Sequence, residues 1–364
     1  MSSKAAAVMV FLLSSILLLQ VLSQSRCTIP PVIFNFGDSN SDTGGLVAGL
    51  GFPVNLPNGR NFFASSTGRF CDGRLIIDFF CESLNSSRQQ LLSPYLDSIR
   101  GHTYENGVNF AVAGSKTLPK YTPFALNIQL MQFIHFKSLS LQLSSPGHLI
   151  NEEGFKNALY MIDIGQNDLA DSFANNLTYA QVIRTIPSII TEIKNAIKAI
   201  HDQGGGRKFW VHNTGPFGCL PKPLTLAKSK TSNDLDSYGC LTSYNAAARI
   251  FNAALLHLCG ELRSELSDST IVYVDIYSIK FDLIANSSRY GFASPLMACC
   301  GSGGPPYNYD LRVGCGLYGY EVCTTKYVNW DGVHYTEAAN FFVAAKVLSM
   351  NYSTPRVPFD FFCR

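Results

Sequence analysis

The residues best able to do chemistry in this chain form two short motifs that lie far apart. Gly37-Asp38-Ser39 directly follows the apolar run Pro31–Phe36, and Asp331-Gly332-Val333-His334 lies near the end of the sequence. A serine hydroxyl is a useful nucleophile only when a nearby base takes its proton, and histidine is the usual base because its pKa lies close to neutral pH. The two motifs therefore predict Ser39 as the nucleophile of a hydrolase and His334 as its base.

The segment before Ser39 predicts where the nucleophile sits. Val32, Ile33, Phe34 and Phe36 are β-branched or aromatic, as in a buried strand, and Gly37-Asp38 ends the strand in a turn. Ser39 would then lie at the carboxyl end of a strand, which is the edge where open α/β sheets bind ligands.

Acyl transfer also needs hydrogen-bond donors for the negative charge that develops on the carbonyl oxygen. Two segments could supply them. Asn109–Gly114 ends an apolar run in a glycine whose backbone N–H can approach a ligand closely. Gly165-Gln166-Asn167-Asp168 follows a predicted strand, so the amide of Asn167 reaches the same sheet edge.

Four blocks in this order resemble the GDSL esterase/lipase family of the SGNH hydrolase superfamily, and closely its plant-type secreted branch. The resemblance spans nearly the whole mature chain and rests on Phe36–Gly44, Asn109–Gly114, Gly165–Asp168 and Asp331–His334. The chain departs from the family name at one position, because Asn40 stands where the eponymous leucine would be.

The resemblance implies a serine triad and an oxyanion hole. Ser39 would attack, His334 would act as base and then acid, and Asp331 would orient the imidazole; three residues before the histidine, it can reach Nδ1 across a single turn. The oxyanion hole would consist of the Ser39 and Gly114 backbone N–H groups and the Asn167 side chain. No metal or organic cofactor is implied. The implied fold is a flavodoxin-like, three-layer α/β/α sandwich with a central parallel sheet, and the chain contains no Gly-x-Ser-x-Gly elbow of the α/β-hydrolases.

Other polar residues near these blocks have simpler interpretations. We expect Asp38 to fix its turn by accepting backbone N–H bonds, Asp168 to support Asn167, and His212 to be a satisfied structural histidine. The other histidines lack a serine motif or a carboxylate at triad spacing. A group of tyrosines could stack on sugar or acyl groups or could simply pack: Tyr307, Tyr309, Tyr318 and Tyr320.

Composition and periodicity predict one globular domain over residues 26–364. The chain has 46% hydrophobic residues and a formal net charge of +2, and no dense Lys/Arg run that would indicate a nucleic-acid partner. Further buried strands are predicted at Tyr160–Ile164, Phe209–His212 and Ile271–Val274. Helices are predicted at Ala180–His201 with a kink at Pro187, at Leu241–Leu266, and at Thr336–Leu348 with Phe341, Phe342, Ala345 and Leu348 facing inward.

Two long segments break the alternation of strands and helices. Gly44–Gly73 and Ser294–Lys326 are rich in Gly, Pro, Asn, Ser and Tyr and lack periodicity. Loops of this length are usually functional, so we expect them to form walls of the substrate cleft.

The amino-terminal residues predict export. Residues 1–25 carry Lys4, the apolar stretch Ala5–Leu22 and small residues suited to cleavage, which is typical of a secretory signal. The alternative is a retained membrane anchor, but polar residues interrupt the stretch and no second such segment follows, so no stable anchor is expected. Secretion would allow N-glycosylation at four sequons: Asn85, Asn176, Asn286 and Asn351.

The cysteines fit an oxidising compartment. Eleven are present, so at least one is unpaired in a monomer, and the connectivity cannot be deduced. No Cys-x-x-Cys pair suggests a zinc site. We expect disulfides to hold Ser294–Lys326, which contains Cys299, Cys300, Cys315 and Cys323.

The sequence thus favours a secreted esterase and leaves its acyl group open. Resemblance to the branch containing early-nodulin-type proteins and acetylesterases favours short acyl groups on glycosylated or cell-wall substrates. A lipase for longer chains is the alternative, and would need an apolar groove to which Phe52, Phe62, Phe63 and Phe292 could contribute. Two other classes are a glycosidase using Asp38 and Asp331, and a non-catalytic secreted binding protein.

Overall fold

The central element is a mostly parallel sheet. The computed structural model describes residue 27 and residues 29–84, 91–97, 99, 104–118, 123–143, 150–227 and 234–363. The parallel strands are β1 (Ile33–Gly37), β2 (Gly107–Asn109), β3 (Leu159–Asp163), β4 (Lys208–His212) and β5 (Thr270–Val274). The short β10 (Ser353–Thr354) pairs antiparallel with β5, giving the order β10-β5-β4-β3-β1-β2. The parallel part has the flavodoxin-like order 2-1-3-4-5, so the predicted fold class is confirmed.

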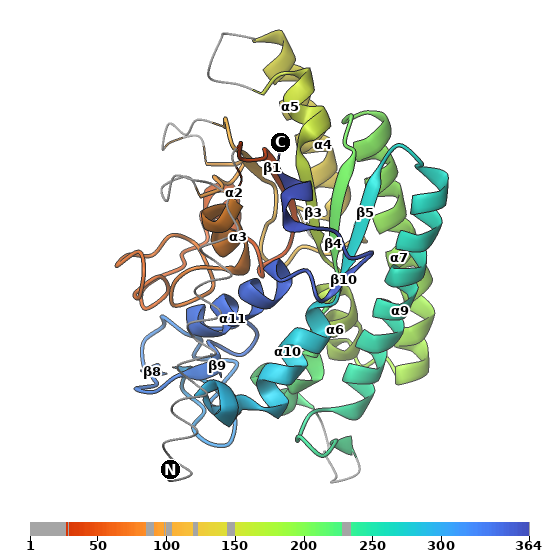
Figure 1. The fold of residues 1–364 in the computed structure, drawn as a ribbon. Coiled ribbons are helices and arrows are strands. Elements are labelled where there is room, and N and C mark those ends of the chain that lie inside the picture. The colour runs from red at the N-terminus through yellow and green to blue at the C-terminus, as the bar shows by residue number, and fades with distance from the viewer. Residues whose placement is uncertain are drawn as a thin grey trace, which may run out of the picture.

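Helices cover both faces of this sheet, and Figure 1 shows α7 and α9 along one face and α3 and α11 along the other. The longer helices are α3 (Ile76–Leu84), α4 (Leu126–Gln142), α6 (Gln166–Ala174), α7 (Tyr179–Asp202), α9 (Thr242–Glu265), α10 (Ile276–Ala285) and α11 (Glu337–Leu348). Shorter helices are α2 (Gly45–Leu50), α5 (Glu152–Asn157) and α8 (Pro221–Leu226), with 3-10 turns η1 (Phe217–Cys219), η3 (Ser287–Tyr290) and η4 (Phe359–Phe362). Within the described ranges, no helix combines the length and apolar character needed to cross a bilayer.

The predicted elements agree with the structure to within a residue or so at each end. Thr178 caps α7 through a capping box with Gln181, and Thr336 caps α11 by accepting from Ala339 N. The inward face predicted for the last helix needs a correction, because Phe341 and Phe342 are only partly buried while Val343 and Ala344 are fully buried. The two rings pack instead against neighbouring elements, Phe341 on Phe79 of α3 and Phe342 on Phe292.

The core lies on both sides of the sheet and is aromatic around β1. Every residue of β1 is buried. Phe34 stacks on Phe155 at 5.3 Å between ring centroids and meets Phe133 edge-on at 5.1 Å. Paired aromatic rings of this kind resist displacement, so β1 is a rigid base for the turn that follows it.

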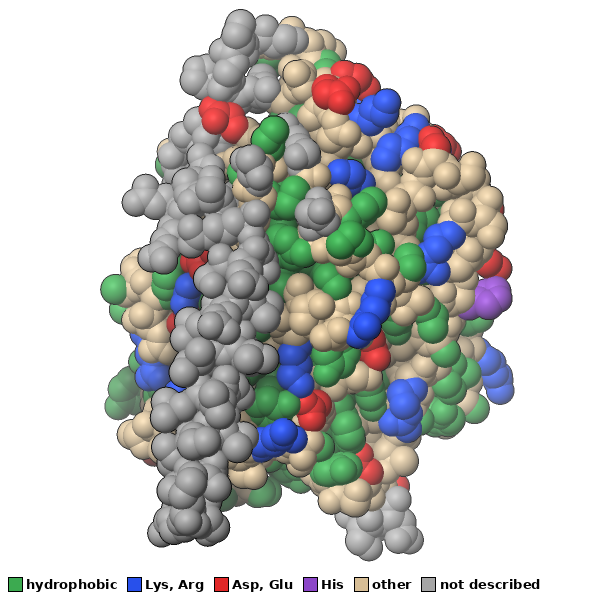
Figure 2. Space-filling model, viewed as in Figure 1, with side chains coloured by type: hydrophobic (Ala, Val, Ile, Leu, Met, Phe, Trp, Pro, Cys, Tyr) green, Lys and Arg blue, Asp and Glu red, His purple; other side chains and the backbone are tan. Residues whose placement is uncertain are grey.

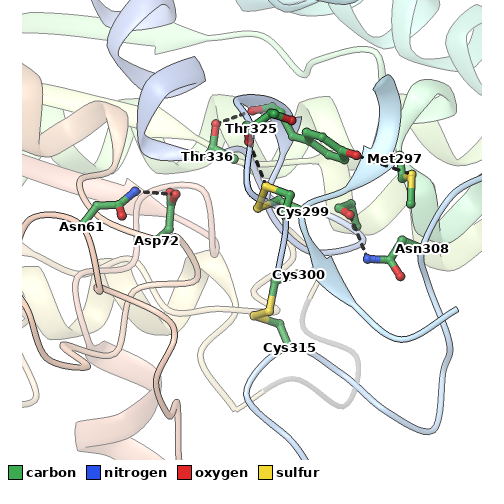
Figure 3. The surroundings of a disulfide bond; sticks show 12 residues. Asn61, Asp72, Met297, Cys299, Cys300, Asn308, Cys315, Thr325 and Thr336 are labelled. Atoms are coloured by element: carbon green, nitrogen blue, oxygen red, sulfur yellow. Dashed lines mark hydrogen bonds between the residues drawn. A yellow bond between two sulfur atoms is a disulfide. The ribbon is translucent and has the colours of Figure 1, made fainter. Parts of the chain in front are cut away.

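The segment Ser294–Lys326 folds around two adjacent disulfides, as predicted, and Figure 3 shows them side by side. Cys299 bonds Cys323, and Cys300 bonds Cys315. Around them lie two small sheets, one of β6 (Ala293–Ala298) with β9 (Tyr327–Asn329) and one of β7 (Cys300–Gly301) with β8 (Glu321–Val322). The segment has little hydrophobic core of its own, so covalent bonds take over that function.

Two further disulfides lie elsewhere in the chain. Cys27 bonds Cys363 and so joins the two ends of the described chain, and Cys219 bonds Cys240 across α8. Three described cysteines are unpaired and buried, namely Cys71, Cys81 and Cys259. Burial raises the pKa of each of these thiols, which keeps them protonated and unreactive.

Candidate active site

Asp331 and His334 form a tight pair in the loop before α11. The Oδ2 atom of Asp331 lies 2.7 Å from His334 Nδ1, while Oδ1 accepts the backbone N–H groups of Val333 and His334 at 2.7 and 2.8 Å. Burial favours the neutral form of Asp331, but the charge of His334 and these hydrogen bonds outweigh it and hold the carboxyl pKa below its ordinary value. Asp331 is therefore an anion that fixes the imidazole and leaves Nε2 available. Among the described residues, that buried Nε2 has no hydrogen-bond partner.

Ser39 is buried in the turn that ends β1, and its neighbours hold the turn in shape. Asp38 Oδ1 accepts both the backbone N–H and the side-chain N–H of Asn40 at 2.9 Å. Asp38 thus fixes its turn as predicted. These bonds bracket Ser39, which lies between the two residues and is only 6% exposed.

The predicted oxyanion donors converge on this turn. Asn167 lies in the first turn of α6. Its Nδ2 atom donates to Ser115 O at 3.0 Å and to Asp38 Oδ2 at 3.3 Å. Gly114 has φ of 81°, and a Cβ atom there would meet nothing within 4 Å, so its backbone faces open space. Neither the Gly114 nor the Ser39 backbone N–H donates to another described residue. Three donors expected from separate blocks therefore surround one turn.

A network of buried amides and one carboxylate locks these blocks together, and the sequence analysis did not identify it. Asn35 donates to Asn109 Oδ1 at 2.8 Å, and Asn109 donates to Ser41 O at 2.7 Å. Asp42 accepts from Ala113 N at 2.8 Å and from Gly44 N at the start of α2.

Gln129 of α4 completes this network. It exchanges two bonds with the Gly37 backbone, at 2.8 and 3.0 Å. Polar residues at strand interiors, such as Asn35, were the available signal for the network, because a buried amide must find partners.

The loop that carries His334 and the turn that carries Ser39 are close enough to interact. His334 lowers the pKa of Asp38 through its charge, against the larger effect of burial, which raises it. The ring of Phe70 packs on the His334 ring at 5.1 Å between centroids, and Lys222 N donates to Gly332 O at 2.9 Å. The structure thus brings together all five predicted site residues, Ser39, Gly114, Asn167, Asp331 and His334, within one region.

Two cavities adjoin this region and share Lys222 and Val333. The first, of about 350 Å³, is bordered by Asp331 and His334 and by both long loops. The second, of about 330 Å³, is bordered by Asn167 and by side chains from α6, η1, α8 and α9. The two segments expected to form cleft walls therefore face the first cavity, and the second was not anticipated.

Few of the aromatic residues singled out by sequence line a cavity. Tyr309 and Phe52 border the first one, whereas Phe292 is buried in the core and Tyr318 is fully exposed.

The ring of Tyr309 lies against Gly332, where a Cβ atom would come within 2.2 Å of it. Burial and the nearby Asp331 raise the Tyr309 pKa to about 12. Gly332 is therefore required by the close approach of this ring.

Two expectations for supporting residues change in detail. Asp168 accepts from Thr117 N at 3.0 Å and from Thr117 Oγ1 at 2.9 Å, so it holds the segment after Gly114 rather than Asn167. His212 is buried among the rings of Phe80 and Trp210, but its Nε2 lacks a partner among the described residues. It is structural but unsatisfied at one nitrogen, and burial lowers its pKa to about 3.

The surface carries the features expected for glycosylation and no obvious charged patch on the face seen in Figure 2. On that face Lys and Arg side chains are interspersed with acidic and apolar ones. Asn176, Asn286 and Asn351 are exposed. Asn85 and the predicted signal segment 1–25 lie outside the described residues.

Comparison with known proteins gives consistent matches over nearly the whole chain. Residues 33–347 match the family described as GDSL-like Lipase/Acylhydrolase. The chain is 62% identical to GDSL esterase/lipase At1g09390 of Arabidopsis thaliana, over 93% of this chain and 91% of that one. It is 44% identical to Alpha-L-fucosidase 3 of the same plant, over 92% and 96%. A solved structure, phospholipase A1 from Streptomyces albidoflavus, aligns at 11% identity with a TM-score of 0.39, over 89% of this chain and 100% of that one.

Proposed function

Because the chain belongs to the GDSL-like lipase/acylhydrolase family, we propose that this carboxylic ester hydrolase works through an acyl-enzyme formed on Ser39. The observation that carries the proposal is the Asp331–His334 pair, at 2.7 Å, with Nε2 buried and without a partner among the described residues, in the same region as the serine turn. An imidazole held in this way can accept a proton only at Nε2.

The reaction follows from these positions. His334 Nε2 takes the Ser39 hydroxyl proton as Oγ bonds to the ester carbonyl carbon, and it returns the proton to the departing alcohol oxygen. Water then repeats the sequence and releases the acid. The Ser39 and Gly114 N–H groups face the developing oxyanion, and Asn167 joins them because its 3.3 Å contact with Asp38 is long enough to be exchanged.

The glycosidase alternative must be considered because one relative is named Alpha-L-fucosidase 3. It would require Asp38 and Asp331 to reach a sugar. Asp331 uses both carboxylate oxygens on His334 and Val333, and Asp38 uses both on Asn40 and Asn167. Carboxylates engaged in this way are poor nucleophiles and proton donors, whereas the serine and histidine remain available. The esterase is therefore the better account.

We further propose that the substrate carries a short acyl group on a glycosylated or cell-wall alcohol. Support comes from Asn55 and Tyr309 on the wall of the first cavity, whose polar groups can bond to a polar alcohol. One observation favours the longer-chain alternative: both cavities carry apolar side chains, such as Phe52 and Leu317 in the first and Phe217 and Leu220 in the second. A chain seated there would gain about 0.8 kcal/mol per buried methylene.

A series of p-nitrophenyl esters from acetate to octanoate, with p-nitrophenyl fucoside beside it, tests these alternatives together. We expect kcat/KM to be highest for acetate or butyrate and no fucoside turnover. A steady rise through octanoate would replace the short-acyl proposal by the longer-chain alternative. Fucoside turnover that persists in Ser39→Ala would contradict the esterase mechanism.

Secretion and N-glycosylation belong to the same proposal. The disulfides and the exposed sequons Asn176, Asn286 and Asn351 support it. Expression in plant cells should deliver the mature chain to the medium with a mass that falls on treatment with an N-glycan amidase. Retention of the uncleaved chain inside the cell would contradict it.

A further inference from the structure

A buried lysine lies beneath the nucleophile turn, and the proposed mechanism does not use it. Lys280 is on α10 and is only 6% exposed. Its Nζ atom donates to Asn40 Oδ1 at 3.4 Å and lies 4.6 Å from the centroid of the Tyr335 ring. Its stem packs against Gly215, where a Cβ atom would come within 2.9 Å of Lys280 Cδ. Neither contact of the ammonium is an ion pair, so its charge needs compensation from farther groups.

The compensating carboxylates, Asp163 and Asp38, lie at the carboxyl ends of the neighbouring strands β3 and β1. Register pairs Gly37 of β1 with Asp163 of β3, and Asp163 with His212 of β4. Residues paired in this way point to the same face of a sheet. His212 packs against Phe80 of α3, so Asp163 beside it also faces the layer that contains α3 and α11. Asp163 and Asp38 are the carboxylates whose charges act on Lys280.

Asn40 connects this lysine to the nucleophile turn. Its amide oxygen accepts from Lys280, its amide nitrogen donates to Asp38 Oδ1, and its backbone N–H donates to the same oxygen. A leucine at position 40 could make neither side-chain bond. Asn40, which stands where the family name has leucine, is therefore the residue that allows the turn to bond to Lys280.

We propose that Lys280 is a positioning residue for Ser39: acting through Asn40, its buried charge keeps Asp38 ionised and holds the nucleophile turn in one geometry. The inference rests on the proposed role of Ser39. It goes beyond that role in assigning a function to a lysine that contacts neither substrate nor reacting atoms.

The electrostatics of the cluster support this assignment. Burial raises the pKa of Asp38, and Asn40, His334 and Lys280 oppose that rise. Burial and the charge of Asp38 raise the Asp163 pKa to about 7, again against Lys280. Burial lowers the pKa of Lys280, and the two carboxylates oppose it. Removing the ammonium would therefore raise both carboxyl pKa values and leave Asp38 protonated at a pH where it is now charged.

Lys280→Met tests the proposal because it keeps the stem and removes the charge. On p-nitrophenyl acetate we expect kcat to fall about tenfold with KM unchanged, and the acid limb of the kcat profile to move up by about 1 pH unit. Lys280→Arg retains the charge and should return that limb toward its original position. An acid limb as far displaced in Lys280→Arg as in Lys280→Met would count against the proposal.

Lys346→Met is the matched control. This lysine of α11 pairs with Asp282 at 2.5 Å, away from the turn. Its loss should lower the melting temperature and leave the pH profile unchanged. If Lys280→Met behaves in the same way, Lys280 is only structural and the proposal is overturned.

Asn40→Leu decides the matter if Lys280→Met does not fold. It removes the connection between lysine and carboxylate while filling the same space. A lowered kcat with a displaced acid limb supports the proposal, and a wild-type profile contradicts it. Retained turnover in Ser39→Ala, measured alongside, would instead contradict the proposed function itself.

Discussion

The two sides of the site are held by different means. The nucleophile side is the end of β1, where Ser39 is fixed by buried amides from regular elements, among them Asn109 and Gln129. The base side is a loop, where His334 is fixed by Asp331 and by the ring of Phe70, while the ring of Tyr309 packs on Gly332. Next to it stands a segment held by two disulfides. One side depends on the sheet, and the other on local bonds and covalent closure.

Because of this difference, substitutions on the two sides should have different effects on folding and on catalysis. Damage to the buried network should disturb the fold and the nucleophile together, because its amides lie in the core. Damage to the base side should lower catalysis or widen the cavity while the sheet remains intact. The predictions below test this separation, from the largest expected effect to the smallest.

Asp331→Asn should cause the largest loss on the base side. An amide would hold the imidazole in the wrong tautomer, so kcat on p-nitrophenyl acetate should fall by about 10⁴, with the melting temperature nearly unchanged. Asp310→Asn is the control, because Asp310 borders the same cavity but pairs with the exposed Arg312. A loss of less than tenfold in Asp331→Asn would remove Asp331 from the triad.

Asn167→Ala should have the next largest effect, now on the nucleophile side. Loss of one oxyanion donor lowers kcat by roughly 10²–10³, and KM should change little. Asn175→Ala, at the exposed end of the same helix, should leave both constants unchanged. A change confined to KM would make Asn167 a substrate-binding residue and leave the oxyanion hole to the backbone.

The same division explains what the sequence could predict. Ser39, Asn167 and the strands before them follow from short apolar runs that end in polar turns, because a parallel sheet brings all such ends to one edge. Helices α7 and α11 follow from caps and periodicity, and α9 follows from periodicity. These are local signals, and the structure agrees with them closely.

What the sequence could not predict depends on contacts between distant segments. Asn35 and Gln129 are ordinary polar residues until the fold places them together. In the sequence, Lys280 is an ordinary basic residue of a helix. It is buried in the fold, and its partner Asn40 lies 240 positions away in the chain. The cavity beside Asn167 combines residues from several elements, so no single segment predicts it. Disulfide pairing also could not be predicted, because cysteine spacing alone allows many connectivities.

Removing the Cys300–Cys315 disulfide should test the covalent part of the base side. Its loop separation of 15 residues corresponds to about 3 kcal/mol of stability, and its residues border the first cavity. Replacing both cysteines by serine should lower the melting temperature and raise KM for bulky alcohol esters. Replacing Cys27 and Cys363, which join the chain ends, should cost stability without the change in KM. Equal KM values in the two double variants would show that this disulfide does not shape the cleft.

At neutral pH the smallest effect is that of His212 on the sheet side, because it appears only as the pH falls. His212 has its pKa lowered to about 3 by burial, so the unfolded chain takes up a proton below pH of about 6.5 that the folded chain refuses. Stability is thus retained above that pH and falls by up to about 1.4 kcal/mol per pH unit down to about 3. His212→Phe should flatten this slope in urea unfolding. An unchanged slope would indicate that His212 titrates normally.

The central claim is that Ser39 is the nucleophile, and covalent labelling tests it most directly. The intact protein is treated with a fluorophosphonate, and the adduct is located by peptide mass spectrometry. The account predicts one adduct, on Ser39, with parallel loss of esterase activity and no adduct in Ser39→Ala. Labelling at another residue, or an active enzyme that takes up no label, would contradict it.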